Sequence, residues 1–588
     1  MPRALSLCRA SIAAACLIAA CHSGEERILL RVEGNPMEPL RDAGDASDGD
    51  PGSVGPTDLL PDADTGDAEA GPGSVVSSNC GNGDLDTAEG EQCDDGNDQH
   101  SDGCDNDCRP TRITQVGIGE GFLCALSSGG GVKCWGRDLN GSLGRAGTGS
   151  DVTHPLAIPI LDFGTTRRVI QIAVGSAHAC ALFEGGKARC WGRNAEGQLG
   201  IGSRLDYGDD GSESLAALAD LPLSDIQSLS AGPYTTCAVT GAEGGESVYC
   251  WGSNSQGELG IGSTSSRTEP DLDRPTALFA KATGVNVGDH MVCAQLDSGA
   301  ARCWGGHDHG ALGVGPIDFN IGDGLGDGSG LGEFPNSAAY NVQGLPDDIT
   351  ALGGSHLTYC AVSQGSLYCW GKNDLGQAGY PVDHHGMEIW QTPRAVDLGN
   401  VVLTQASVAA SHGCVVDEAG IVRCWGHSSE GALGYRGIDL VGANRDPATD
   451  YLRHRYIVEE DAGALDEPNA TDAGSAADAG TASDAGVAPA DAGVAVDGGP
   501  GPCDCPLPLG AVDLGDFDDD PGVDRVATVV TGFKASCAIM ETGGLRCWGD
   551  NGLGRLGYGP TLTEIGFSQT PAEVYEDHGY ADVPVFGQ

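Results

Sequence analysis

The sequence is poor in aromatic residues, in basic residues and in long apolar runs. Aromatic side chains make up 5% of its 588 residues, and 31 Lys and Arg residues stand against 84 Asp and Glu residues, for a net charge of −53. Nucleic-acid binding requires a basic surface, so the composition excludes it. No segment after the N-terminal stretch has the roughly 18 apolar residues of a membrane-spanning helix, so we predict none. We interpret the acidity as a source of solubility.

Glycine and cysteine are abundant instead. The 95 glycines favour short strands and turns over helices. The 23 cysteines recur at regular spacing, which is rare in cytosolic proteins. Three of them, Cys8, Cys16 and Cys21, lie at the N-terminus, and the remaining 20 are an even number that permits ten disulfides. The cysteines therefore predict an oxidising compartment.

The N-terminal segment is predicted to export and tether the chain. Residues 1–20 combine two arginines with an apolar run, which indicates a signal peptide. Ile-Ala-Ala-Cys at 18–21 resembles a bacterial lipobox, which implies lipidation of Cys21; an ordinary cleaved signal is the alternative. His22 stands where an Asp would resemble an inner-membrane retention signal, so we expect an outer-membrane lipoprotein of the bacterial cell envelope, or a secreted protein. Residues 21–79 are rich in Gly, Pro, Ser and Asp and predict a disordered tether, so only the lipid would contact the membrane.

A cysteine-rich module is predicted at residues 80–109. Its Cys-Gly-Asn-Gly, Gly-Glu-Gln-Cys-Asp-Asp-Gly-Asn and Asp-Gly-Cys sequences resemble the short Cys-rich repeats of secreted bacterial proteins, a resemblance that implies no defined activity. A unit this small has almost no core, so we expect two disulfides, with the pairing open, among Cys80, Cys93, Cys104 and Cys108. Its oxygen ligands suit calcium, but their spacing departs from an EF-hand and favours turn formation by Asp94, Asp95, Asn97, Asp102 and Asp105.

The rest of the chain is built on a repeat. Cys-Trp-Gly occurs seven times, with one Gly six residues and another nine residues after each Trp. A second Cys precedes each copy across a short turn, usually Gly-bearing, which is the pattern of a β-hairpin. Opposed residues of antiparallel strands lie within disulfide reach; zinc is the competing interpretation, but it needs ligands in fours. We therefore predict one disulfide per repeat, joining Cys124 with Cys134, Cys180 with Cys190, Cys237 with Cys250, Cys293 with Cys303, Cys360 with Cys369, Cys414 with Cys424, and Cys537 with Cys547.

The extended pattern identifies a family resemblance. It reads V-x-x-G-x-x-H-x-C-A-L, then G-x-V-x-C-W-G-x-N-x-x-G-Q-L-G, and is clearest at residues 172–200. This resembles the RCC1 (regulator of chromosome condensation) repeat and implies an all-β fold, a seven-bladed β-propeller, over residues 113–458 (blades one to six) and 506–588. The cysteine pair in every blade resembles the secreted bacterial members of the family. Pro-led apolar segments upstream of several hairpins supply further strands, which gives about four per blade.

Two features complete the predicted domain organisation. Residues 459–505 repeat Asp-Ala-Gly and predict a disordered acidic insertion between blades six and seven. Cys503 and Cys505 at its end would bond to each other or clamp the insertion to its neighbour, and the sequence leaves this choice open. Residues 570–574 predict a C-terminal strand that completes blade one and closes the ring.

No residue set indicates catalysis, a cofactor or a bound metal. His178 and His412 stand at the same repeat position, two residues before a Cys, and predict a structural role. His-Asp-His at 307–309 and Asp-His-His at 383–385 offer metal ligands, but surface coincidence is the favoured interpretation. The alternating Asp residues at 516–520 begin like a calcium loop that lacks its Gly and its Glu. Nucleophile elbows and phosphate-binding loops are absent from the sequence.

Two classes of function remain. The first is a cell-surface or secreted scaffold that binds an unidentified extracellular or envelope protein through inter-blade loops, with the inserts 201–222 and 314–346 as expected contacts. The second is a hydrolase or lyase with an active site in the central channel, which would need converging polar groups that the sequence does not reveal. Guanine-nucleotide exchange, known for nuclear members of the family, is not expected, because its partner is an intracellular GTPase. We predict a monomer that is not an enzyme.

Overall fold

The computed structural model describes most of the chain between residues 80 and 586. The described residues are 80–87, 91–97, 99–147, 149–241, 247–276, 278, 280–317, 320–323, 340–380, 390–436, 440–441, 511–515, 525–566, 568–578 and 582–586. All of them belong to one compact unit, Ser74–Gln588. The predicted signal peptide, Cys21, the tether, the insertion 459–505, Cys503 and Cys505 lie outside the described residues.

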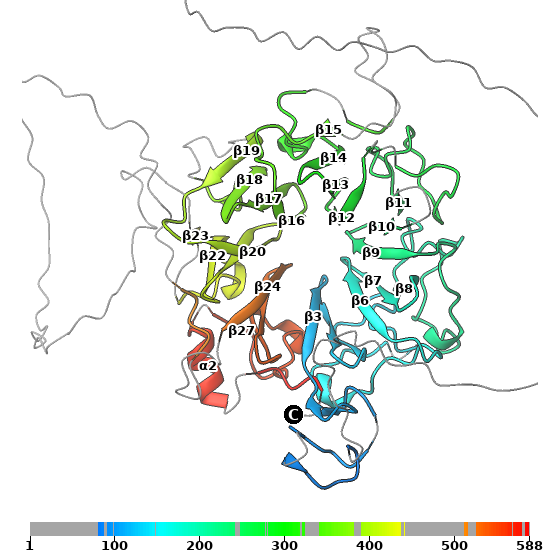
Figure 1. The fold of residues 1–588 in the computed structure, drawn as a ribbon, viewed down its shortest axis with the longest axis vertical. Helices are drawn as coiled ribbons and strands as arrows, with labels where there is room; N and C mark the ends of the chain where they lie inside the picture. The colour runs from blue at the N-terminus through cyan, green and yellow to red at the C-terminus, as the bar shows by residue number, and fades with distance from the viewer. Residues whose placement is uncertain are drawn as a thin grey trace, which may run out of the picture. The chain divides into compact units, whose positions relative to one another are not determined.

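The described residues form seven antiparallel sheets that follow one another around a common axis (Figure 1), apart from the small sheet of the cysteine-rich module. Three of them have three strands each: β3 (Ile113–Ile118), β4 (Phe122–Ser127) and β5 (Val132–Gly136); β6 (Val169–Val174), β7 (His178–Phe183) and β8 (Lys187–Gly192); and β9 (Ile226–Ala231), β10 (Thr235–Thr240) and β11 (Ser247–Gly252). Within each sheet the strands pair in chain order, and the first strand faces the axis. The predicted all-β fold of repeated antiparallel sheets is confirmed.

The other four sheets add an outer strand, which has two residues in three of them and seven in the fourth. They are β12 (Ala282–Val287), β13 (Met291–Leu296), β14 (Ala301–Gly305) and β15 (Tyr340–Asn341); β16 (Ile349–Ser355), β17 (Thr358–Ser363), β18 (Ser366–Gly371) and β19 (Trp390–Val396); β20 (Leu403–Val408), β21 (His412–Asp417), β22 (Val422–His427) and β23 (Leu440–Val441); and β24 (Val526–Gly532), β25 (Ala535–Met540), β26 (Leu545–Asp550) and β27 (Glu564–Ile565). The cysteine-rich module contributes β1 (Cys104–Asp105) and β2 (Arg109–Pro110). Short 3-10 helices are η2 (Pro155–Ala157), η3 (Leu215–Ala217), η4 (Asp308–Gly310), η5 (Ser429–Gly431) and η6 (Gly552–Gly554), and the α-helix is α2 (Pro571–His578).

The second strand of each sheet forms the core. In β4, β7, β10, β17, β21 and β25 every residue is buried, and in β13 only Gln295 is partly exposed. An ordinary surface strand alternates between buried and exposed residues. The continuous burial arises because each sheet is covered on both faces by its two neighbours.

Each hairpin is joined across its second and third strands by a disulfide. The two cysteines stand directly opposite each other, with Cα atoms 4.0–4.1 Å apart, in all seven sheets. The bonded pairs are the seven that the repeat predicts: Cys124 with Cys134, Cys180 with Cys190, Cys237 with Cys250, Cys293 with Cys303, Cys360 with Cys369, Cys414 with Cys424, and Cys537 with Cys547.

The module, whose pairing the sequence left open, contains two further disulfides. Cys80 bonds to Cys108, and Cys93 bonds to Cys104. The described part of the chain therefore holds nine disulfides, which indicate an oxidising compartment.

The Trp of Cys-Trp-Gly is an interface residue between consecutive sheets. Its indole nitrogen donates a hydrogen bond to a backbone oxygen of the preceding sheet in six pairs: Trp191 to Ser142 (3.1 Å), Trp251 to Gln198 (2.9 Å), Trp304 to Glu258 (2.8 Å), Trp370 to Ala311 (2.8 Å), Trp425 to Gln377 (2.9 Å) and Trp548 to Ala432 (3.0 Å). A Gly of the preceding sheet lies against this indole ring; it is the Gly nine residues after that sheet's own Trp. At Gly200, with φ +73°, a Cβ would come within 2.7 Å of the Trp251 indole nitrogen. The motif therefore requires glycine at this position.

The predicted C-terminal strand at residues 570–574 is wrong. Residues 571–578 form the helix α2, because Thr570 and Glu573 make a reciprocal capping box and Pro571 stands at the start of the helix. The backbone nitrogen of Thr570 donates to the Glu573 carboxylate (2.8 Å), and the backbone nitrogen of Glu573 donates to Thr570 Oγ1 (3.3 Å).

The Pro-led segments also belong to a different sheet from the one predicted. Each runs back along the hairpin before it: the backbone nitrogen of Leu161 donates to Val132 O (2.9 Å), and that of Val583 donates to Leu545 O (2.7 Å). Residues 582–586 therefore edge the last sheet, and the first sheet has three strands of its own. The C-terminal segment still reaches the first sheet, where Lys133 Nζ donates to Val585 O (2.7 Å).

Candidate functional site

The two ends of the ring carry different loops. Because strands alternate in direction, the connection from first to second strand lies at one end and the hairpin turn at the other. We call the two residues at the apex of each first connection the tip ring. It consists of Glu120 and Gly121, Ser176 and Ala177, Pro233 and Tyr234, Asp289 and His290, His356 and Leu357, Ala410 and Ser411, and Phe533 and Lys534.

A cavity of about 480 Å³ lies inside the tip ring, on the axis of the seven sheets. Its lining comes from the first strand or tip of every sheet, from residues 117–120 to residues 530–533, and most of it is backbone or small side chains. The ionisable lining residues are Glu120, Asp289, Tyr234 and His356. Burial lowers the pKa of His356; the charge of Lys372 acts in the same direction, and the charges of Asp289 and Glu120 act against it.

A hydroxyl–imidazole contact lies in the channel, between Ser355 Oγ and His356 Nδ1 (3.0 Å). A hydrolytic triad needs, in addition, a carboxylate hydrogen-bonded to the other imidazole nitrogen. Among the described lining residues, no carboxylate comes within hydrogen-bond distance of His356. This part of the channel therefore lacks the triad geometry.

A chain-specific charged cluster joins the third and fourth sheets at the tip ring. Glu258 occupies the repeat position held by Gln198 and Gln377, and its side chain is 1% exposed. Its Oε1 lies 3.0 Å from His290 Nδ1, while Asp289 Oδ1 lies 3.4 Å from His290 Nε2. The hydrogen bond to Glu258 raises the pKa of His290. His290 is thereby held as a cation between two carboxylates at mildly acidic pH.

An aromatic patch adjoins this cluster. Tyr234 stacks on His290 with ring centroids 6.2 Å apart, and the Arg193 guanidinium lies 5.8 Å from the Tyr234 ring. All three side chains are partly exposed. Arg and Tyr are among the residue types that most often dominate the binding energy of protein interfaces.

A second charged cluster lies on the sixth and seventh sheets. Lys534 Nζ is 2.8 Å from Glu430 Oε1, and Arg555 Nη2 is 3.0 Å from Asp550 Oδ2. Lys534 has φ 60° and His290 has φ 61°, at the tip position where the first sheet has a glycine. Non-glycine residues in this region carry backbone strain, which is typical of functional loops.

His178 and His412 hold neighbouring sheets together. His178 Nε2 lies 2.9 Å from Thr236 Oγ1, and that hydroxyl donates its proton to Gln198 O (2.8 Å). His412 Nε2 lies 2.9 Å from Ser536 Oγ in the same arrangement. Each hydroxyl has one proton, already donated, so Nε2 must be the donor. Burial lowers the pKa of both histidines to about 4, and they are neutral at physiological pH.

The other sequence-derived candidates play smaller parts. No group of three or more metal-ligating side chains comes together among the described residues, which include 307–309; residues 383–385 and 516–520 fall outside them. In the module, Asp94 Oδ1 accepts a hydrogen bond from the backbone nitrogen of Gly96, two residues on (2.8 Å), as a turn-forming residue does. Its carboxylate also accepts from the backbone nitrogens of Gly81 (3.0 Å) and Gly83 (2.9 Å), which lie earlier in the chain.

The insert 201–222 packs largely against its own ring. Leu215, Leu218 and Leu221 are buried, and Asp220 pairs with Arg189 at 2.8 Å. Residues 209–212 form a continuously exposed stretch within it. Much of the insert 314–346 lies outside the described residues. Sequence reasoning did not single out the tip ring, whose signal was the variation of the two residues that follow the Gly of the Gly-x-x-x-x-Cys pattern.

Seven sheets around an axial channel define a β-propeller, and comparisons with known proteins identify its family. Two models of the Regulator of chromosome condensation (RCC1) repeat match the chain, one at residues 130–182 and 246–295, the other at 169–198, 226–258 and 526–555. The chain is 31% identical over 324 residues to the Ultraviolet-B receptor UVR8 of Arabidopsis thaliana. The match covers 55% of this chain and 67% of that protein. The chain belongs to the RCC1 repeat family.

Other matches support the fold alone. The chain is 28% identical over 325 residues to the E3 ubiquitin-protein ligase HERC2 of Homo sapiens, but the match spans 55% of this chain and 6% of the ligase. The solved structure of yeast RCC1 (Prp20) bound to Kap60 aligns with a TM-score of 0.51 at 17% identity, covering 78% of this chain and 84% of that one. No helix of the described residues is long and apolar enough to span a membrane.

Proposed function

We propose that this protein is an exported, seven-bladed RCC1-like propeller that binds a protein partner through its tip ring. The observation that carries the proposal is the contrast between the tip ring and the frame, by which we mean the seven disulfide-bonded hairpins and the Trp and Gly residues that pack between them. The frame repeats the same disulfide, Trp and Gly in every sheet, whereas the tip residues range from Gly and Ala to Glu, His, Lys, Phe and Tyr. A rigid frame with variable loops is the usual construction of a recognition surface.

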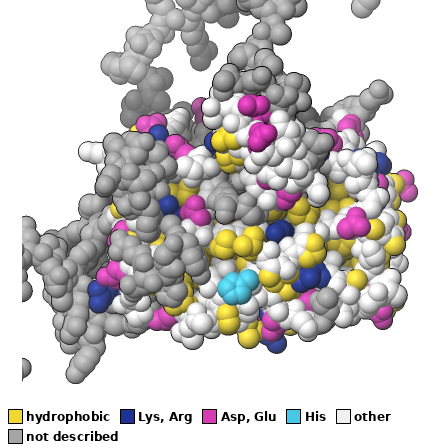
Figure 2. Space-filling view, turned by 90° about the horizontal axis from the view of Figure 1, so that it is seen from below, with side chains coloured by type: hydrophobic (Ala, Val, Ile, Leu, Met, Phe, Trp, Pro, Cys, Tyr) yellow, Lys and Arg dark blue, Asp and Glu magenta, His cyan; other side chains and the backbone are white. Residues whose placement is uncertain are grey.

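The chemistry of the tip ring supports a protein partner. Tyr234 and the 41%-exposed Phe533 provide aromatic anchors on separate sheets. Glu120 of the ring and Arg193, which lies beside the ring against Tyr234, provide charges of both signs. An aromatic centre with a mixed polar rim is the anatomy of specific protein interfaces. Figure 2 shows the molecule turned by 90° from Figure 1. On the face seen there, apolar, acidic and basic side chains are interspersed.

The disulfides favour a partner in an oxidising environment. Nine of them lie in the described residues, and glutathione keeps most cytosolic thiols reduced. Together with the predicted signal peptide and lipidated Cys21, this supports an extracellular or envelope protein as the partner. An enzyme is disfavoured because the described channel residues lack the triad geometry and are mainly backbone or small.

The proposal is tested by cross-linking the oxidised full-length chain to isolated cell-envelope proteins. Arg193→Ala combined with Phe533→Ala should reduce cross-linking to the partner by at least about tenfold, since such residues contribute more than 1 kcal/mol each at interfaces. Glu418→Ala, at the exposed hairpin-turn end, is the matched control and should change nothing. Equal cross-linking by both variants would refute the tip ring as the binding surface.

The enzymatic alternative is tested separately. Ser355→Ala removes the hydroxyl that contacts His356 and substitutes no tip-ring residue. We expect no hydrolysis of ester, peptide or glycoside substrates by the wild type. Turnover that disappears in Ser355→Ala would replace the scaffold proposal with a channel enzyme.

A further inference from the structure

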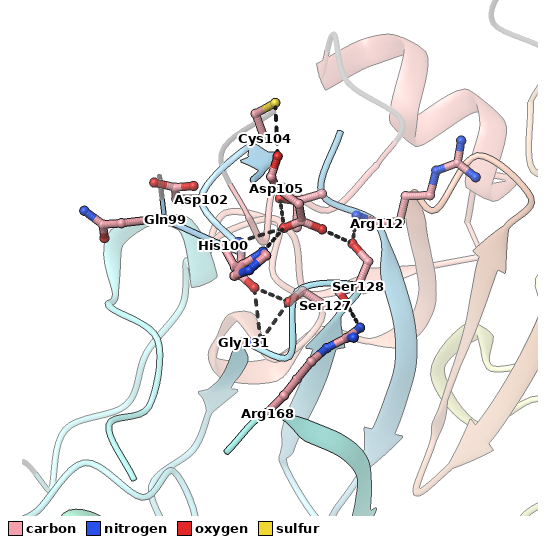
Figure 3. Close-up of polar contacts among 12 residues, drawn as sticks. Gln99, His100, Asp102, Cys104, Asp105, Arg112, Ser127, Ser128, Gly131 and Arg168 are labelled. Atoms are coloured by element: carbon pink, nitrogen blue, oxygen red, sulfur yellow. Dashed lines mark hydrogen bonds and ion pairs between the residues drawn. The ribbon is translucent and has the colours of Figure 1, made fainter. Parts of the chain in front are cut away.

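The cysteine-rich module is held against the first sheet by a buried carboxylate (Figure 3). Asp105 is 6% exposed and accepts hydrogen bonds from the backbone nitrogen of Ser101 (2.9 Å), from Thr111 Oγ1 (3.1 Å) and from Ser128 Oγ (2.6 Å). Ser128 belongs to the hairpin turn between β4 and β5. The backbone nitrogen of Gly131 in this turn donates to Ser101 Oγ (3.0 Å). The module and the first sheet therefore share one polar junction at the end of the ring opposite the tips.

A second cavity, of about 440 Å³, opens beside this junction. Three arginines line it and come from three separate segments: Arg109 from β2 in the module, Arg112 from the link to β3, and Arg168 from the residue before β6. Residues of the module and residues of the ring both line the cavity. The cavity therefore forms because the module packs against the first sheet, and it is not a feature of the repeated sheets.

Two of these arginines have no ion-pair partner among the described residues. The side chains of Arg109 and Arg112 make no hydrogen bond or ion pair with the described residues, and both residues are exposed. In Figure 3 the Arg112 side chain points away from Asp105. Arg168 donates to Ser128 O and lies 4.0 Å from Glu184. A guanidinium that lacks an internal partner is available to a ligand.

The lining holds three arginines against two carboxylates, Asp105 and Asp107, so positive charge exceeds negative charge by one. Asp105 is already bonded to three donors inside the junction, and Asp107 is the other carboxylate in the lining. The chain has 31 basic residues against 84 acidic ones. A lining with a net positive charge therefore stands out in a chain that is strongly acidic overall.

The geometry points to an anion-binding site in this cavity, with a tetrahedral oxyanion (the phosphate or sulfate group of a ligand) as its occupant. Guanidinium groups bind oxyanions through paired N–H donors. Three guanidinium groups together carry more N–H donors than a planar carboxylate accepts, whereas phosphate and sulfate present oxygens on several sides. The site lies at the opposite end of the ring from the tip ring, so it is independent of the proposed partner surface.

Calorimetric titration of the oxidised full-length protein with inorganic phosphate, inorganic sulfate and acetate tests the site. We expect one phosphate or sulfate per chain, with weaker binding as salt rises, and no comparable binding of acetate. Arg109→Gln combined with Arg112→Gln should weaken the affinity by about tenfold or more, as expected for lost charge-assisted hydrogen bonds. The two side chains make no hydrogen bond or ion pair with the described residues, so the midpoint of thermal unfolding should be the same as in the wild type.

Arg137→Gln combined with Arg145→Gln is the matched control. It removes the same charge from residues outside the cavity lining and should leave the affinity within about twofold of the wild type. Absence of phosphate and sulfate binding at millimolar concentration, equal weakening by both double variants, or a preference for acetate would each overturn the proposal.

Discussion

The interface between the sixth and seventh sheets and the seam between the seventh and first sheets are held in different ways. At the first, Gln405 Nε2 donates to Val529 O and the Val529 nitrogen donates to Gln405 Oε1, both at 2.8 Å, across 124 residues of sequence. The backbone nitrogen of Thr531 donates to Ser407 Oγ (2.9 Å). His412 and Trp548 add their own bonds. At this interface, consecutive sheets are joined by side-chain hydrogen bonds.

The seam lacks most of these bonds. The Trp135 indole nitrogen has no hydrogen-bond partner within the described part of the chain, although Gly557 lies beside it as the repeat requires. Instead, Lys133 Nζ donates to Val585 O, its ammonium lies 5.3 Å from the Phe586 ring, and the Ile113 nitrogen donates to Gly543 O (2.9 Å). The seam is closed by the C-terminal segment and by apolar packing.

The comparison shows what holds the ring together. The longest connection between sheets, which contains the insertion 459–505, joins two sheets that share a rich set of side-chain bonds. No connection crosses the seam, and there the C-terminal segment takes over. Contacts between sheets, and not the connections between them, therefore account for the closed ring. The repeated disulfides fix each hairpin but join no two sheets.

The largest effect is expected at the seam. Ending the chain at His578 removes Val583, Val585 and Phe586, which are 2–3% exposed, and should lower the free energy of unfolding by on the order of 5 kcal/mol. Ending the chain at Phe586 is the control and should have little effect. Guanidinium unfolding of both variants measures the difference. Equal stability of the two would mean that the C-terminal segment does not close the ring.

A change of pH should weaken the interfaces that contain a histidine. The pKa of His178 and of His412 is about 4 when folded, against about 6.5 in an unfolded chain, so the unfolded state binds more protons between these values. Their contribution to stability is intact above pH 6.5 and falls as pH drops to 4, by up to about 3 kcal/mol for each histidine.

His412→Gln isolates this effect. The variant should be less stable at pH 7 but should lose less further stability than the wild type between pH 6.5 and pH 4. Urea unfolding across this pH range makes the measurement. Parallel pH curves for wild type and variant would show that the imidazole is not the titrating group.

A smaller effect separates two equivalent tryptophans. Trp191→Phe leaves Ser142 O without its donor, whereas Trp135→Phe removes a nitrogen that makes no hydrogen bond with the described residues. Both rings are fully buried, so the loss of packing is matched. Trp191→Phe should therefore be the more destabilising by about 1 kcal/mol. The reverse order, measured by denaturant unfolding, would show that the seam tryptophan is bonded in solution.

Sequence reasoning reached the frame because the frame repeats. The opposed cysteines and the Gly-bearing turns fix the hairpins, and their number follows from counting Cys-Trp-Gly. It failed where local signals compete: Pro571 was interpreted as a strand start, although Thr570 and Glu573 form a capping box. It also could not place the module, since Asp105 and Ser128 meet only in the folded chain.

The tip ring was harder still to predict. Glu258 departs from the Gln of other repeats, which is visible in the sequence, but its contact with His290 of the next sheet is not. Neighbours of this kind are set by the stagger between sheets, which a single sequence does not encode locally. The residues that carry the proposed function are therefore those that break the repeat.

The most direct test of the ring account is the unfolding free energy of a variant in which a short Gly-Ser linker replaces residues 459–505. If contacts between sheets hold the ring, the value should stay within about 1 kcal/mol of the wild type, because loop length adds only a small entropic cost. A loss as large as that of the chain ending at His578 would contradict the account.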